Sequence, residues 1–326
     1  MTADAPEVND EGAETAEVPE ALEGVRVDAA AAQLFPDFSR ARLKRWIEDG
    51  ELTVNGAPVA RPRDPVREGD LLALNVVLED EVAAIEPEDI PLTLVHVDEA
   101  VAIVNKPAGL TVHPGAGIHG GTLQNALLHR FPQLRQVPRA GLVHRLDKDT
   151  SGLLLIALTL PAHTQVVAAL ARREIRREYD ALVHGAPVSG GTVDAPIGRN
   201  PRDRLKMAVV AGGRPSVTHY RVHERYEHQT WLRVRLETGR THQIRVHMAH
   251  VRMPIVGDAL YGGKMARGAG MDADVREALN GFPRQALHAR ELEFTHPVSG
   301  ERLAFAAEPP ADMQSLLQCL RAATPR

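Results

Sequence analysis

The chain has 326 residues, 44% hydrophobic and 25% charged, which is typical of a globular protein long enough for two domains. No stretch reaches the roughly 18 apolar residues of a membrane-spanning helix, and the acidic first residues do not resemble a signal peptide. The single cysteine, Cys319, excludes an internal disulfide and a cysteine metal cluster. We therefore expect a cytoplasmic protein without a membrane partner.

The formal net charge of -5 hides an uneven distribution of charge. Residues 1–24 contain eight acids and no Lys or Arg, which leaves 35 acids and 38 bases in the rest of the chain. Basic residues gather at 40–45, 172–177 and 199–206. Such clusters create local positive fields that suit nucleic acid, although any one cluster alone is better explained as a solvated surface.

The first part of the chain is predicted to contain a tail and a small domain. Residues 1–24 are rich in Ala, Glu and Pro, lack hydrophobic periodicity, and are expected to form a disordered acidic tail. In the small domain, residues 25–78, an apolar-periodic helix ends near Phe35. Ser39 is a plausible N-cap for a second, basic helix, which stops at Gly50.

Strand-like segments complete this small domain. Residues 52–59 carry an Asn55-Gly56 hairpin turn, and residues 67–76 close the unit. The pattern resembles the S4 domain, a small α/β RNA-binding module of ribosomal proteins and RNA-modifying enzymes. The resemblance implies that the basic helix faces RNA through Arg40, Arg42, Lys44 and Arg45.

A larger domain is expected at residues 91–326, after an acidic, proline-containing linker at residues 79–90. Hydrophobic periodicity predicts strands at 92–98, 100–106, 152–159, 177–185, 216–226 and 230–239, and helices at 121–131, 161–173 and 240–250. Several strands alternate between apolar and polar residues. An α+β fold is therefore expected, with a mixed or antiparallel central sheet flanked by helices.

A glycine-rich segment, residues 115–120, matches the dinucleotide-binding pattern GxGxxG. That pattern must directly follow a buried strand, whereas Pro107 and Pro114 interrupt the approach here. No carboxylate follows at the spacing needed to bind a ribose hydroxyl. We interpret the segment as a flexible loop before a helix.

The most informative segment is GLVHRLDKDTSGLLLIA, residues 141–157. It sets a cluster of polar side chains directly against an apolar strand, which would hold the charges at the edge of the core. A capped, charged turn would have the same composition, so this segment alone leaves a structural and a functional interpretation open. The cluster comprises His144, Arg145, Asp147, Lys148, Asp149, Thr150 and Ser151.

The motif HRLDKDTSG resembles the signature of the A/C/D group of pseudouridine synthases that act on large ribosomal subunits. The similarity runs from Pro91 to about Asp312, and the PGAG, HRLDKDT and VTHYR stretches are most similar to the D type. Five further stretches keep the family's order: NKPAGLTVHPG (105–115), RREYDALVHG (176–185), GRTHQIRVHMAH (239–250), PIVGDALYGG (254–263) and QALHARELEFTHP (285–297). The resemblance implies a pseudouridine synthase fold that isomerises specific uridines of 23S ribosomal RNA.

The chemistry of this family explains the residue types. Converting uridine to pseudouridine moves the bond to ribose from a base nitrogen to a base carbon without net redox change, so no cofactor or metal is expected. The reaction needs an ionised carboxylate that attacks C1′ or C6, or removes a ribose proton. The resemblance assigns this role to Asp147; composition alone does not choose between Asp147 and Asp149. It also implies Arg245 as the cation that keeps the carboxylate ionised in a dry pocket.

Further site residues follow from the same resemblance. Tyr179 is expected to stack on the target base, although a core tyrosine on a strand is the ordinary alternative. Arg145 is expected to occupy the place that the flipped base vacates, with a plain phosphate contact as its alternative. His144 and Arg240 are expected to contact RNA near the same pocket.

Other classes of function fit the sequence less well. The spacing of His242, His247 and His250 does not suit a metal site, and hydrogen-bonding roles are expected for them. A hydrolase triad of Ser151, His144 and Asp147 is disfavoured because residues so close in sequence rarely converge. Two alternatives stay open, namely a non-catalytic RNA-binding or ribosome-assembly factor, and the same chemistry at other ribosomal or transfer RNA uridines. The expected partner is structured RNA, free or in an assembling particle, bound by a monomer.

Overall fold

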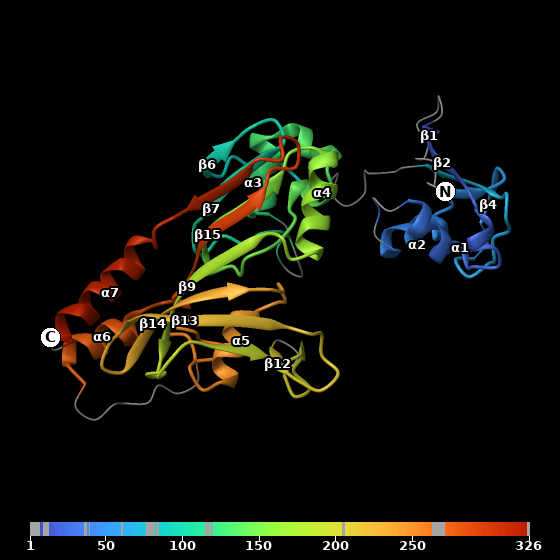
Figure 1. Cartoon of the computed structure of the whole chain (residues 1–326). Helices are drawn as coiled ribbons and strands as arrows, with labels where there is room; N and C mark the ends of the chain where they lie inside the picture. Colours follow the sequence, from blue (N-terminus) through green and yellow to red (C-terminus); the bar gives the residue numbers. More distant parts are fainter. Residues whose placement is uncertain are drawn as a thin grey trace. The chain divides into compact units, whose positions relative to one another are not determined.

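A computed structural model describes residues 7–8, 13–35, 38, 40–59, 61–75, 82, 85–114, 118, 120–203, 206–262 and 271–324. The chain divides into two compact units, Met1–Asp80 and Glu81–Arg326 (Figure 1). Within the described ranges no helix has both the length and the apolar character to cross a membrane.

The first unit is a five-stranded antiparallel sheet that shares one core with two helices. The strand order is β1–β2–β5–β3–β4. The elements are β1 (Glu7–Val8), β2 (Ala13–Glu17), η1 (Glu20–Leu22), α1 (Val27–Leu34), α2 (Arg40–Glu48), β3 (Leu52–Val54), β4 (Ala57–Pro58) and β5 (Leu71–Asn75). The hairpin turn predicted at Asn55-Gly56 is confirmed, since both residues have positive φ values, of 52° and 78°.

The acidic segment before residue 25 differs from the disordered tail that its composition predicted. β2 pairs with β5 along its whole length, from Ala13 opposite Asn75 to Glu17 opposite Leu71. Val18 and Leu22 are buried in the core of the first unit. These apolar residues anchor a segment in which Glu17, Glu20 and Glu23 are exposed, an arrangement that average composition does not reveal. Residues 1–6 and 9–12 of the predicted tail lie outside the described residues.

The second unit is built on a nine-stranded mixed sheet. Its order is β10–β13–β14–β9–β15–β8–β7–β6, with β16 paired to β15. The strands are β6 (Thr93–Val97), β7 (Val101–Lys106), β8 (Ser151–Ala157), β9 (Arg176–His184), β10 (Gly191–Asp194), β13 (Val217–Arg225), β14 (Gln229–Leu236), β15 (Leu287–Thr295) and β16 (Arg302–Ala306). β15 is parallel to β8, while the other described strand pairings are antiparallel. This confirms the predicted α+β class with a mixed sheet.

Helices and a short hairpin complete the second unit. The hairpin joins β11 (Ile197–Arg199) and β12 (Met207–Val209). The helices are α3 (Leu123–Arg130), η2 (Pro132–Gln136), η3 (Pro138–Gly141), α4 (Leu160–Ala171), α5 (Gln243–His250), α6 (Ala273–Gly281) and α7 (Ala311–Ala323). In Figure 1, α6 and α7 lie together at one end of the unit, and α4 lies at the other. The predicted strands and helices of this unit are all present. The elements that were not predicted are β10, β11, β12, β15, β16, η2, η3, α6 and α7.

The predicted linker at residues 79–90 is in part packed on the second unit. Val82 is buried in the main core of that unit. The Asn125 side chain donates a 2.7 Å hydrogen bond to the Glu86 carbonyl, and a Glu88 carboxylate oxygen accepts one of 2.8 Å from the Gly121 amide. Its hydrogen bonds therefore make this segment part of the larger unit.

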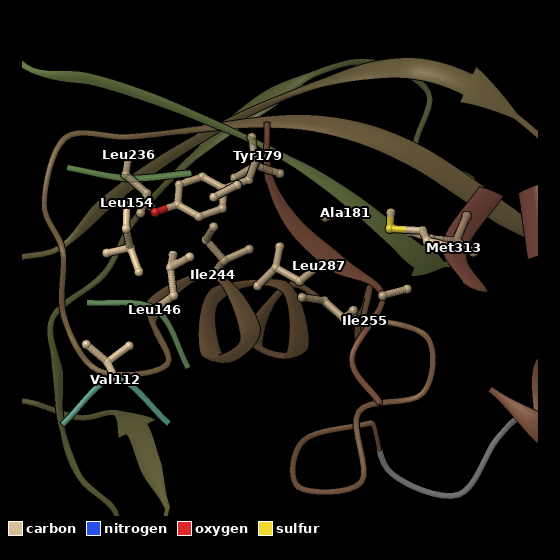
Figure 2. Close-up of a cluster of buried hydrophobic side chains, with 14 of the residues drawn as sticks. Val112, Leu146, Leu154, Tyr179, Ala181, Leu236, Ile244, Ile255, Leu287 and Met313 are labelled. Atoms are coloured by element: carbon tan, nitrogen blue, oxygen red, sulfur yellow. The ribbon is translucent and has the colours of Figure 1, made fainter. Parts of the chain in front are cut away.

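β8 is the buried strand on which the site depends. Every residue of β8 is buried, and neighbouring side chains enter two different cores. Leu154 belongs to the main core, whereas Leu153 and Leu155 belong to a smaller core with α4. Figure 2 shows Leu154 near Leu146 of the preceding loop. A strand held on both faces gives the loop before it a rigid anchor.

Candidate active site

The loop between η3 and β8 carries Asp147 and is held in place by a buried lysine. The ammonium group of Lys106, which is inaccessible to solvent, donates to the carbonyls of Pro107 (2.7 Å), Leu110 (2.9 Å) and Lys148 (2.9 Å). Three ammonium protons therefore meet three carbonyl oxygens. Burial lowers the pKa of Lys106 to about 7, against the opposing charges of Asp149 and Asp147. Lys106 lies in the NKPAGLTVHPG stretch, but no local pattern there predicts this role.

A second cation fixes the other side of the loop. Arg284 donates to the Asp149 carbonyl at 3.2 Å and holds the Asp312 carboxylate bidentately, at 2.7 and 2.8 Å. The Gln285 side chain donates to the Thr150 hydroxyl at 3.2 Å. Asp147 lines the large cavity beside the loop, whereas Asp149 is not among the lining residues. The structure thus distinguishes the two acids that composition alone left equivalent.

The structure brings Asp147 and Arg245 together, although they are 98 positions apart. Arg245 Nη1 lies 3.0 Å from Asp147 Oδ2. The same guanidinium holds Asp258 bidentately, with Nε and Nη2 at 2.7 and 2.8 Å from its two oxygens. Burial alone would lower the pKa of Arg245, but Asp258 and Asp147 outweigh it and raise that pKa above its usual value. One guanidinium therefore bridges two carboxylates at the cavity wall.

Asp258 is a site residue that sequence reasoning missed. It follows Gly257 in a tight turn, where its Oδ1 also accepts hydrogen bonds from the amides of Leu260 (2.9 Å) and Tyr261 (3.0 Å). Burial opposes ionisation, yet the hydrogen bonds and charge of Arg245 lower the pKa of Asp258 below its usual value. A fixed carboxylate of this kind sets the plane of the Arg245 guanidinium. The PIVGDALYGG stretch held the signal, but spacing did not reveal the partner.

His242 faces the other oxygen of Asp147 and is fixed by a tyrosine. The Tyr261 hydroxyl accepts a 2.9 Å hydrogen bond from the Met207 amide and lies 2.7 Å from His242 Nδ1. The hydroxyl proton is available to Nδ1, an arrangement that places the proton of the neutral ring on Nε2, 3.9 Å from Asp147 Oδ1. Burial lowers the pKa of His242, against the opposing charge of Asp147, so the ring is neutral at pH 7.

The remaining histidines of α5 have different environments. His247 is buried between the Thr218 hydroxyl (2.8 Å) and the Ala195 carbonyl (2.9 Å). His250 is exposed. In the part of the chain that is described, no three His, Cys, Asp or Glu side chains are arranged to hold a metal ion. The Ser151 hydroxyl lies 2.9 Å from His288 Nδ1, so Ser151 pairs with a residue outside the hydrolase triad considered above.

The cavity beside Asp147 has a volume of about 890 Å³, within the range of small-molecule sites. Tyr179 lies in its wall and is 5% exposed. Figure 2 shows its ring near Leu154, Leu236 and Ile244. Burial raises the pKa of Tyr179, with Arg177 opposing this shift and Asp147 adding to it. The wall of the cavity therefore contains a carboxylate, a guanidinium and an aromatic ring beside apolar side chains.

The other residues predicted around this pocket also line the cavity. Arg145 is exposed, while His144 and Arg240 are partly buried. Arg177 lines it too, is only 8% exposed, and was not predicted as a site residue. It lies two residues before Tyr179 on β9, so strand alternation puts both side chains on one face of the sheet. That alternation was the signal that could have identified it.

The basic helix α2 of the first unit presents its described cations to solvent. Arg40, Lys44 and Arg45 have side chains that are 62%, 56% and 55% exposed. Each lies near a carboxylate: Asp28 at 3.6 Å, Glu48 at 3.5 Å and Asp49 at 3.4 Å. The Arg42 side chain and most of the glycine-rich segment at 115–120 lie outside the described residues.

Comparison with known proteins identifies relatives of both units. Residues 100–250 match a family model described as RNA pseudouridylate synthase, and residues 25–72 match an S4 domain. A Xanthomonas campestris protein named ribosomal large subunit pseudouridine synthase D is 56% identical over 93% of this chain and 91% of its own. The Escherichia coli protein of that name is 51% identical over 94% of both. The solved structure of human RNA pseudouridylate synthase domain containing 4 is similar, with a TM-score of 0.55, 26% identity, and coverage of 70% of this chain and 92% of its own.

Proposed function

The chain belongs to the RNA pseudouridylate synthase family, and we propose that Asp147 is the carboxylate with which it isomerises uridine in large-subunit ribosomal RNA. The relatives that match over more than nine tenths of the chain carry this substrate in their names. The observation that best supports the choice of Asp147 is its 3.0 Å contact with Arg245 at the wall of the cavity.

The reaction is balanced in atoms and electrons. The bond between C1′ and N1 of uracil breaks, the base turns, and C1′ joins C5. The proton that leaves C5 is matched by the one gained at N1, so neither an oxidant nor a reductant takes part. An ionised carboxylate can start this sequence at C1′, at C6, or by removing a ribose proton. Each route requires the Asp147 oxygen to be free of a proton and fixed in direction.

The neighbours of Asp147 supply these two conditions. Arg245 holds Oδ2, and Asp258 fixes Arg245 in turn. Oδ1 faces the neutral ring of His242 at 3.9 Å and is the oxygen left for the substrate. Tyr179 stacks on the flipped uracil, while Arg145, exposed at the cavity, takes the place of the base in the RNA stem.

Binding of the RNA as a whole is assigned to the first unit and to the basic residues around the cavity. The exposed cations of α2 grip the phosphate backbone, and recognition depends mainly on RNA shape, because only 4% of residues are aromatic. We infer a monomer that works in the cytoplasm on large-subunit RNA or on an assembling particle.

Mapping of pseudouridines in ribosomal RNA tests the proposal. Cells that lack the protein should lose specific pseudouridines, and the intact gene should restore them. A gene with Asp147→Asn should restore none, although the variant still binds RNA. Asp149→Asn is the matched control, because it removes a carboxylate two positions along the chain that does not line the cavity. Restoration by Asp147→Asn, or an RNA pattern that never depended on the protein, would contradict the proposal.

A further inference from the structure

Three buried hydrogen-bond donors of the cavity have no acceptor among the described residues. They are Nε of Arg177, Nε of Arg240 and Nδ1 of His144. A buried donor without a partner costs about 1–3 kcal/mol, so native structures rarely contain several in one place. Their presence in one cavity indicates a ligand that brings acceptor oxygens to it.

Arg177 is the central residue of this group. Its side chain is more than nine tenths buried, and the described residues place no carboxylate within ion-pair distance of it. A Cβ atom added to Gly239 would lie 2.9 Å from Arg177 Nη1, so the guanidinium lies against the backbone next to Arg240. This differs from Arg245, which has two carboxylates. A buried guanidinium without a protein anion is a site for an external one.

The protonation of His144 adds a third donor. Its Nε2 accepts a 3.1 Å hydrogen bond from the Leu155 amide, so in the neutral ring the proton is on Nδ1. Burial, together with the nearby charge of Arg177, lowers the pKa of His144 to about 3, which keeps the ring neutral. Nδ1 therefore carries an N–H group without an acceptor among the described residues, and His144 lines the same cavity as Arg177.

The charge of the cavity favours an anion. Six arginines line it, against two carboxylates, Asp147 and Glu237. Both acids already have arginine partners, Arg245 for Asp147 and Arg173 for Glu237. Arg177 also lies about 7 Å along β9 from Tyr179, a separation comparable to that between the base and a phosphate of one nucleotide. A neutral ligand would leave the charge of Arg177 unmatched.

We propose that Arg177, with the Nε–H group of Arg240 and the Nδ1–H group of His144, binds the phosphodiester next to the flipped uridine. This rests on the proposed function for the identity of the ligand. A planar guanidinium binds two phosphate oxygens at once, so it neutralises the charge of the phosphate and fixes its orientation. The sugar that is bonded to this phosphate is then fixed as well. The site would hold C1′ of the nucleotide against Asp147 while the base turns.

The test measures RNA binding separately from chemistry. The probe is a stem-loop carrying a mapped uridine, made with an ordinary linkage or with an uncharged methylphosphonate on its 5′ or its 3′ side. Binding is measured in the Asp147→Asn background, so that no product forms. Arg177→Met should bind the ordinary RNA roughly 10- to 100-fold more weakly. It should also reduce the slope of log affinity against log salt by about 0.7–0.9. One methylphosphonate should weaken binding by the protein with Arg177 and have little effect on Arg177→Met.

Arg176→Met is the matched control. Arg176 is the residue before Arg177 on β9, lies on the opposite face of the strand, and pairs with Glu178 and Glu293. Its substitution should leave both affinity and salt slope unchanged, and Arg177→Lys should recover the slope. Thermal unfolding checks that each variant is folded, and the methylphosphonate comparison with Arg177 in place needs no substitution other than Asp147→Asn. If Arg177→Met and both methylphosphonates leave binding unchanged, water satisfies these donors and the inference is wrong. The proposed function then still stands wherever the native enzyme forms pseudouridine.

Discussion

Arginines and lysines occur in two contrasting settings in this protein, the surface of α2 and the cavity beside Asp147. On α2, more than half of each described cationic side chain is exposed, and each lies within 4 Å of a carboxylate of its own unit. In the cavity, Arg245 and Arg177 are less than one tenth exposed, and their charges act where little water screens them.

The difference separates the cations that we expect to attract RNA from those that we expect to act in catalysis. Exposed ion pairs contribute less than about 1 kcal/mol each and weaken with salt. Buried charges are costly unless they are paired, so their partners are fixed in number and direction. Changes in the cavity should therefore alter catalysis or stability strongly, whereas changes on α2 should alter affinity weakly. The following experiments test that contrast, beginning with the largest expected effect.

Arg245→Met should abolish both functions of the buried guanidinium. Loss of the cation that orients Asp147 is expected to lower kcat by about 10³-fold or more. It also leaves Asp258 buried without a cation, so the free energy of unfolding should fall by about 3–5 kcal/mol. Single-turnover kinetics and denaturant unfolding measure the two effects.

A double variant separates stability from catalysis at this site. Arg245→Met with Asp258→Asn removes both charges but keeps the amide oxygen that accepts from Leu260 and Tyr261. It should recover much of the lost stability and none of the lost activity. Arg245→Met with near-normal kcat would show that Asp147 needs no cationic partner.

The second contrast between the units concerns pH, because all 15 histidines lie in the second unit and none lies before residue 96. His288 is 1% exposed, and burial lowers its pKa from 6.5 to about 4. The folded state then binds fewer protons than the unfolded state below pH 6.5, so stability falls as the pH falls. The slope approaches about 1.4 kcal/mol per pH unit below pH 6.5, and the loss between pH 6.5 and 5 is about 1.6 kcal/mol for His288 alone.

The two tryptophans allow this to be measured in each unit, since Trp46 lies in the first and Trp231 in the second. Trp46→Phe leaves a reporter of the second unit, and Trp231→Phe leaves one of the first. The second unit should lose stability between pH 6.5 and 5, and His288→Gln should reduce that loss. The first unit should change little over the same range. Equal losses in both units would remove the histidines as the cause.

The buried strand β8, which holds the loop of Asp147, was easier to predict from sequence than the hydrogen bonds and ion pairs of the site. β8 and the hairpin at Asn55-Gly56 follow from local patterns, an apolar run and a turn dipeptide. Lys106 and Asp258 were missed because their partners lie elsewhere in the sequence. Arg177 was missed although its alternation with Tyr179 on β9 places both side chains on one face. Lys106, for example, bonds a carbonyl 42 positions away. The pairing of β15 between β8 and β9 is likewise a long-range contact.

The next effect concerns the group that fixes His242. Tyr261→Phe removes the hydroxyl that lies 2.7 Å from His242 Nδ1 and accepts from the Met207 amide. The ring is then free to change its proton position, and kcat should fall by about tenfold with little change in KM. The acid limb of the kcat profile should shift, which a merely structural loss would not produce. Tyr220→Phe, on β13 and outside the cavity lining, is the control and should have normal kinetics.

The smallest effect is expected on α2. Replacing Arg40, Lys44 and Arg45 together with Gln should raise KM about three- to fivefold and leave kcat unchanged, because each cation offers only a screened phosphate contact. The difference from the unsubstituted protein should shrink as salt is raised.

Removing the carboxylates beside these cations should have the opposite effect on RNA binding from removing the cations. Glu48 and Asp49 lie 3.5 and 3.4 Å from Lys44 and Arg45 and compete with phosphate for them. Glu48→Gln with Asp49→Asn should therefore tighten RNA binding about two- to threefold at low salt. If this pair of substitutions weakens binding instead, the cations of α2 act by stabilising their helix. The cations of α2 would then stabilise the fold, the cations of the cavity would act in catalysis, and α2 would not be a surface that binds RNA.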